Sequence, residues 1–135
     1  MQHKFTLFLL LMLMTIPAMG QWGDLQIESL ENQPKLSEND FKAFVESDKI
    51  FHTVLQIDSE EEANAYIQRE LGMSLERYVF VMLKITISYS FLYEMGESNP
   101  NMFKETPYLA PSSTDLVYTR KYKNKIENVL SKMSQ

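Results

Sequence analysis

The sequence contains no cysteine, and its 135 residues include only two histidines and four glycines. Without thiols the chain can form neither a disulfide scaffold nor a thiolate zinc site, and it has no cysteine nucleophile. His3 and His52 are too few for a multi-histidine metal centre. The scattered glycines form no phosphate-binding loop. We therefore expect no cofactor, no metal site and no catalytic residues.

Residues 1–20 have the pattern of a cleaved signal peptide. Lys4 precedes an apolar run from Phe5 to Ile16, and Ala18 and Gly20 supply small residues at the expected cleavage point. The run is too short for a stable membrane span, and no cysteine follows it to carry a lipid. We expect export through the Sec pathway, an N-terminal arm at residues 21–35 and a single helical domain at residues 36–135.

The compartment can be narrowed by composition. Small secreted animal proteins usually depend on disulfides, and this exported chain has none. It also lacks an Asn-X-Ser/Thr glycosylation site. A periplasmic or secreted protein of a bacterial source is therefore the favoured interpretation.

The longest apolar stretch after the leader runs from Leu75 to Met95. Every odd position from Val79 to Tyr93 is apolar or aromatic, while Lys84, Thr86, Ser88 and Ser90 fill even positions, a pattern typical of a half-buried strand. A single strand of that length would span roughly 50 Å, far more than ordinary strands, and no turn residue divides it. A helix over the same stretch is about 30 Å long, the width of a small domain. The sequence therefore predicts a central helix.

Three polar residues of this helix fall on one narrow stripe at helical spacing: Arg77, Lys84 and Ser88. We expect this stripe to face solvent while the rest of the circumference is buried in a bundle. Lys84 near the middle also argues against a membrane span.

Cap residues mark the other helices. Ser37 and Ser59 precede acidic first turns, Gly72 stops one helix and Ser74 starts the next. The predicted fold class is all-α, a small bundle of about four helices around the central apolar helix, with helices over residues 37–57, 59–71, 75–95 and 112–133.

Charge is unevenly distributed along the chain, whose net charge is −5. Acidic residues gather between Gln21 and Glu76, and basic residues between Leu116 and Gln135. The basic end could dock on an anionic surface, or its helix could pack beside the acidic half of its own domain. The second interpretation is favoured, because an acidic protein is a poor binder of polyanions, and no nucleic-acid partner is expected.

The segments Gly72–Tyr78 and Asp115–Tyr122 open the central and the last predicted helix. A short exported chain with these parts resembles small helical bacterial periplasmic proteins of uncharacterised function. The resemblance covers roughly Leu36 to Met133. It implies an all-α fold and carries no catalytic residue.

Two isolated clusters of polar residues have simpler interpretations than a site. Asp48 and His52 lie four residues apart and could hold a metal or act as a base, but a surface pair on one helix is favoured. Glu60, Glu61 and Glu62 point apart on a helix, so they favour the helix dipole rather than a cation.

The proline-containing segment at residues 97–111 is the best sequence candidate for function, because it is a long loop with apolar side chains. It is predicted to cover a tyrosine-rich helix end, with binding residues Tyr89, Tyr93, Glu94, Phe103 and Tyr108. These side chains could instead cap the bundle core. Two functions remain open: a non-enzymatic interaction module that binds a protein or envelope component, and a carrier of a small apolar ligand.

Overall fold

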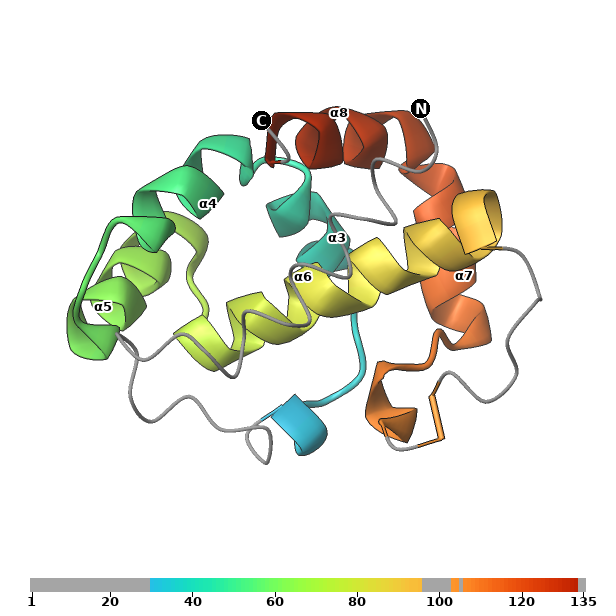
Figure 1. Cartoon of the computed structure of the whole chain (residues 1–135), viewed down its shortest axis with the longest axis horizontal. Helices are drawn as coiled ribbons and strands as arrows, with labels where there is room; N and C mark the ends of the chain where they lie inside the picture. Colours follow the sequence, from blue (N-terminus) through green and yellow to red (C-terminus); the bar gives the residue numbers. More distant parts are fainter. Residues whose placement is uncertain (1–29, 96–102, 105, 134–135) are drawn as a thin grey trace.

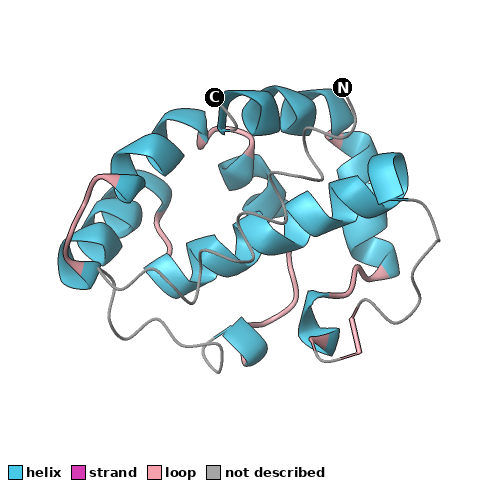
Figure 2. Ribbon diagram, viewed as in Figure 1, coloured by secondary structure: helices cyan, strands magenta, loops and turns pink. Residues whose placement is uncertain are grey.

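The computed structural model describes residues 30–95, 103–104 and 106–133. Every regular element in these ranges is helical, which confirms the predicted all-α class (Figure 2). The expected signal peptide and most of the expected arm at residues 21–35 lie outside the described residues.

Helix α6, Leu75–Ser90, is the centre of the fold. It runs along the molecule with α5 near its start and α7 near its end, and it contacts α3, α5, α7 and α8 (Figure 1). All of its residues from Tyr78 to Ser90 are buried. Buried Thr86 donates its hydroxyl proton to the carbonyl of Met82 at 2.7 Å, four residues back, so the helix satisfies this polar group internally.

Both ends of α6 follow from local chemistry. At the start, the Ser74 hydroxyl accepts a hydrogen bond from the backbone N–H of Arg77 at 3.1 Å, as an N-cap does. At the other end the chain widens into a π-helix, η2, at Phe91–Met95. There the Ser90 hydroxyl donates to a Glu94 carboxylate oxygen at 2.9 Å. The predicted helix over 75–95 is therefore helical throughout but changes type at its end.

Helix α5, Glu60–Leu71, matches its predicted signals closely. The Ser59 hydroxyl accepts from the backbone N–H of Glu62 at 3.3 Å. Gly72 ends the helix in the left-handed region, with φ of 70°, which a glycine adopts without strain. Both ends are thus determined by single residues that the sequence displays.

Six α-helices, rather than about four, make up the described part of the chain, because two predicted helices are each divided. The first becomes α3, Glu38–Phe44, and α4, Asp48–Leu55. Between them the buried Ser47 hydroxyl donates to the carbonyl of Phe44 at 2.6 Å, which holds a tight turn. Helix α3 can then pack on α6 and α7 while α4 packs on α5 and α8.

The last predicted helix is divided at Tyr122 into α7, Ser113–Lys121, and α8, Lys123–Met133. The backbone of Tyr122 leaves the helical region, with φ of −104° and ψ of 17°. Its hydroxyl donates to a carboxylate oxygen of Glu38 at 2.7 Å. The turn allows α7 to lie against α3 and α6, and α8 to lie against α4 (Figure 1). The apolar face of α8 is thereby buried.

The expected solvent-facing stripe on α6 is wrong. Lys84 is 7% exposed, Ser88 is fully buried, and only Arg77 keeps partial contact with solvent. The reason is that Arg77 and Lys84 meet acidic groups of α3 and α7 and carbonyls of the segments before these helices. Ser88 donates its hydroxyl proton to the carbonyl of Lys84 within α6. A buried charge is tolerated where it is paired and hydrogen-bonded.

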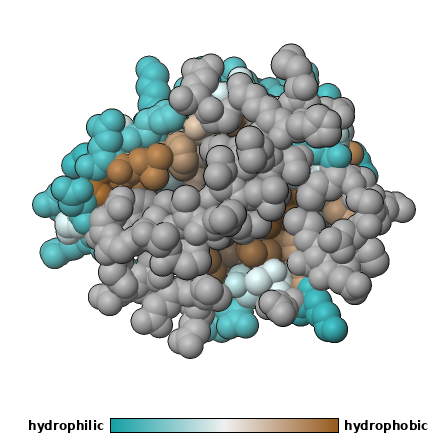
Figure 3. Space-filling model, in the orientation of Figure 1, coloured by the Kyte–Doolittle hydropathy of each residue, from teal (hydrophilic) through white to brown (hydrophobic). Residues whose placement is uncertain are grey.

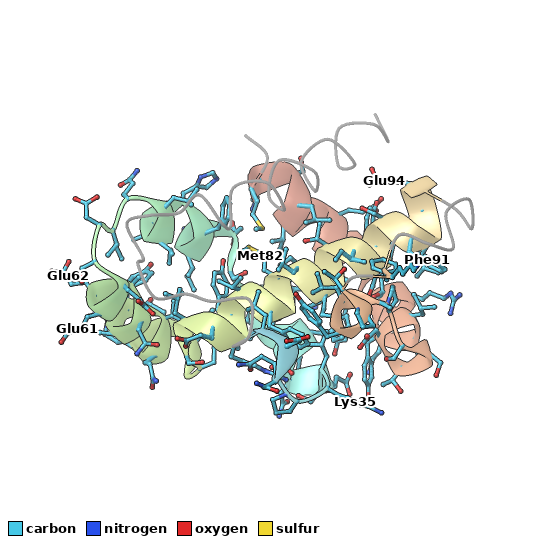
Figure 4. The ribbon with its side chains drawn as sticks, turned by 60° about the horizontal axis from the view of Figure 1, so that its bottom comes forward. Lys35, Glu61, Glu62, Met82, Phe91 and Glu94 are labelled. Carbon is cyan, nitrogen blue, oxygen red and sulfur yellow. The ribbon has the colours of Figure 1, made fainter. Side chains whose placement is uncertain are left out.

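The outer surface follows the usual division. Hydrophilic side chains form the edge near α4 and α5, and hydrophobic ones show toward the middle of the face in Figure 3. Glu61 and Glu62 lie at the outer side of α5 (Figure 4). Within the described ranges, no helix combines the length and apolar character needed to cross a membrane.

Replacing Leu83 tests the packing of α6. Leu83 is 1% exposed, so Leu83→Ala should lower the free energy of unfolding by about 2–5 kcal/mol through the cavity it leaves. Leu55 is 38% exposed, and Leu55→Ala should cost far less. Denaturant midpoints measure both, and an equal loss in the two variants would contradict a central α6.

Candidate functional site

Two helices begin with the same arrangement. At the start of α3, the backbone N–H of Ser37 donates to Asp40 Oδ2 at 2.8 Å. At the start of α7, the backbone N–H of Ser112 donates to Asp115 Oδ2 at 2.9 Å, and the Ser112 hydroxyl accepts from the N–H of Asp115. Both are capping boxes with aspartate as the third helical residue.

Each capping aspartate also binds a cation from α6. The guanidinium of Arg77 lies 2.7 Å from Asp40 Oδ2, and the ammonium of Lys84 lies 2.9 Å from Asp115 Oδ2. Arg77 and Lys84 are seven residues apart, so they lie on the same side of α6. The side chains of the second pair are only 8% and 3% exposed, against 16% and 11% for the first.

The same two cations also bind the chain just before each helix. Arg77 donates to the carbonyls of Pro34 and Lys35, and Lys84 donates to the carbonyl of Ala110 at 2.7 Å. Lys35 and Ala110 occupy equivalent places, two residues before their N-cap serines. We call these two sets of contacts the Arg77 junction and the Lys84 junction.

A cavity of about 260 Å³ lies between the two junctions. Its floor is formed by Phe80 and Lys84 of α6, and its walls come from the segments before α3 and α7. The remaining lining residues are Gln33, Lys35, Leu36, Pro107, Tyr108, Ala110, Ser112 and Asp115.

Tyr108 belongs to a short 3₁₀ helix, η3, at Pro107–Leu109, which forms one wall of this cavity. Burial raises the pKa of the Tyr108 phenol above its ordinary value, and the negative charge of Glu31 raises that pKa further. The phenol therefore stays neutral at physiological pH and can present both an apolar ring and a hydroxyl.

The predicted site residues are divided between two places. Tyr108 lines the cavity, whereas Tyr89, Tyr93, Glu94 and Phe103 are not among its lining residues. Phe103 is half-buried and packs against the hydrophobic core. Residues 97–102 and 105 of the predicted loop lie outside the described residues.

Tyr89 and Tyr93 form part of a separate cluster at the end of α6. Their ring centroids are 5.0 Å apart, and Tyr89 is only 3% exposed. The Tyr89 hydroxyl donates to Glu127 Oε2 at 2.6 Å, and the Lys123 ammonium lies 5.1 Å from the centre of the Tyr93 ring. Burial and the neighbouring Glu127 raise the pKa of Tyr89. This cluster joins α6 to α8.

Glu94 lies in η2 at the same end of the molecule, whereas Lys35 lies beside α3 (Figure 4). Lys35 lines the cavity, whereas Glu94 bonds to Ser90 at the end of α6, so the two residues belong to different regions of the molecule. From the sequence we predicted Tyr108 as a residue of the candidate site, but we did not predict Lys84 or Phe80. A repeated Ser-X-X-Asp pattern at 37–40 and 112–115 is the signal that points to both junctions.

The basic C-terminal end packs beside the acidic half of its own domain, as the favoured interpretation expected, and two of its lysines pair with acidic groups there. Lys121 pairs with Glu38, and Lys132 lies 3.3 Å from Asp48 Oδ2. His52 Nε2 is 2.9 Å from the carbonyl of Lys132, so α8 contacts both members of the suspected Asp48–His52 pair. Asp48 and His52 therefore hold α8 against α4.

Metal binding has no candidate in the part of the chain that the structure describes, where no group of three or more His, Cys, Asp or Glu residues could hold an ion. In comparisons with known proteins, no family model, no curated protein and no solved structure matches this chain. The candidate site therefore rests on its geometry alone.

The two junctions should differ in their contribution to stability. Lys84→Met leaves Asp115 without its cation in a buried place, so we expect a loss of about 3–5 kcal/mol in the free energy of unfolding. Arg77→Met affects a more exposed pair and should cost less. Chemical denaturation of the two variants gives the order, and a smaller loss for Lys84→Met would contradict the burial of its junction.

Proposed function

We propose that this chain is a non-enzymatic binding module of the cell envelope, and that its site is the cavity between the Arg77 and Lys84 junctions. The observation that supports this proposal is the cavity itself, about 260 Å³ in volume. The cavity is partly open to solvent, and concave clefts are the places where small ligands bind.

The lining has the composition of a small-molecule site. Leu36, Phe80 and Tyr108 supply apolar and aromatic surface, and Lys84 supplies a fixed polar group at the floor. Ligand sites are typically concave and apolar with a few well-placed polar groups, and this cavity is slightly smaller than most of them. The concave shape favours a small ligand over a second protein, so the carrier is the version we propose.

The polar groups of the site are rigidly held. Lys84 is positioned by Asp115 and by the carbonyl of Ala110, and Asp115 is itself positioned by the N–H of Ser112. A site whose polar groups are held before the ligand arrives loses less entropy on binding. The two junctions would thus act as the frame of the site.

The place of action remains an inference from residues 1–20. A Sec signal peptide there would deliver the chain to the bacterial periplasm or medium, where a carrier of small molecules could act. Purified exported protein should begin after Gly20.

Native mass spectrometry of the protein purified from its own compartment tests the carrier. We expect a non-covalent small-molecule adduct that is lost on denaturation. Ala110→Leu adds bulk to the cavity lining and should remove the adduct without lowering the melting temperature. The control Thr114→Leu, at an exposed position in α7, should keep it. Wild-type protein without an adduct, or an adduct that Ala110→Leu retains, would contradict the proposal.

A further inference from the structure

The charged residues that line the cavity leave an excess of one positive charge. Lys35 and Lys84 are cationic and Asp115 is anionic, and the other lining residues carry no full charge. Glu31 influences Tyr108 but does not line the cavity. An excess of positive charge in a concave site favours a ligand of opposite charge.

Lys84 has a hydrogen-bond donor to spare. An ammonium group carries three N–H bonds. Two of them point to Ala110 O at 2.7 Å and Asp115 Oδ2 at 2.9 Å. The third can be donated to an oxygen atom placed inside the cavity, and a bond to a charged oxygen is the stronger kind.

Asp115 lies beside the ammonium of Lys84, and its Oδ2 atom already accepts from Lys84 and from the N–H of Ser112. A cationic ligand at Asp115 would stand close to the Lys84 ammonium and would be repelled by it. The polar end of the site is therefore suited to an anion rather than to an ammonium group.

The volume of the cavity and the polarity of its lining indicate the size and the chemical character of the rest of the ligand. A cavity of about 150 Å³ holds benzene, so 260 Å³ leaves space for roughly ten non-hydrogen atoms. Leu36, Phe80 and Pro107 give this space an apolar boundary. A polar body such as a sugar would leave its hydroxyl groups unbonded there.

From these observations we infer that the cavity binds a small monocarboxylate with an apolar body, its carboxylate on Lys84 and its hydrocarbon part against Phe80 and Tyr108. This inference rests on the proposed function, because it names the ligand class of the same site. Lys35 lies at an exposed position of the lining. Its positive charge attracts the carboxylate, but it does not fix the orientation of the ligand.

Three probes of equal chain length test the inference: hexanoate, hexanamide and hexylamine. Isothermal titration of the chain that begins at residue 21 should give a dissociation constant for hexanoate of about 0.1–1 mM, as expected for a ligand of this size. Hexanamide should bind at least about tenfold more weakly, since it lacks the charged acceptor. Hexylamine should not displace hexanoate, and the ring signals of Phe80 and Tyr108 should shift only with bound probe.

A charge variant provides a second readout without disturbing Lys84. Lys35→Met should weaken hexanoate about threefold to tenfold and leave hexanamide unchanged, through the loss of one cation. The matched control Lys49→Met removes an exposed lysine of α4 and should change neither affinity.

Two outcomes would overturn the inference in different ways. If hexanamide binds as tightly as hexanoate, or if Lys35→Met and Lys49→Met have equal effects, the site does not recognise a carboxylate. The proposal of a small-molecule site would still stand. The absence of saturable binding by all three probes would count against both the ligand class and the proposed carrier.

Discussion

The structure depends on two cations of α6 that each hold the start of another helix. Arg77 and Lys84 bind the capping aspartates Asp40 and Asp115, and both donate to carbonyls just before the caps. A single carboxylate oxygen thus completes a helix cap and neutralises a buried or half-buried charge. The positions of α3 and α7 follow from this double use, because neither cap can move without separating an ion pair.

The Lys84 junction has the larger desolvation cost of the two, since both of its side chains are almost completely buried. Removing a lysine and an aspartate from water requires several kcal/mol, and a well-packed apolar pair can be as stable. Stability alone therefore does not explain the choice of these residues. The junction fixes the direction of the chain before α7 and keeps a charged group in the lining of the cavity, which an apolar pair could not do.

The aromatic cluster at the other end of α6 has a simpler role. Tyr89 reaches Glu127 and Tyr93 lies below Lys123, so both tyrosines attach α8 to the central helix. Tyrosine suits this position because its ring packs in the core edge while its hydroxyl finds a partner. The cavity and this cluster use the same residue type for different purposes.

Local signals predicted much of the fold. Ser59, Gly72 and Ser74 act within one turn of the chain, so their roles as caps could be inferred from sequence and are confirmed. The length of the stretch and its lack of turn residues correctly selected a helix over a strand for Leu75–Ser90.

The predictions that were wrong concern residues whose positions depend on partners far away in the sequence. Ser47 and Tyr122 look like ordinary helix residues, and the chain turns there because the two halves pack against different helices. Lys84 was placed at the surface because its partner, Asp115, is 31 positions away and no local pattern joins them. Of the candidate site, only Tyr108 was predicted, since the cavity is made by segments that meet only in the folded chain.

A double-mutant cycle between Lys84 and Asp115 tests most directly whether the junction organises the fold. Lys84→Met, Asp115→Asn and the double variant would be unfolded in denaturant, and Asn keeps an acceptor for the cap of α7. We predict a coupling energy of at least about 2 kcal/mol, as found for close charge pairs in protected surroundings. A coupling below about 0.5 kcal/mol would mean that the two residues act independently, and would contradict the account.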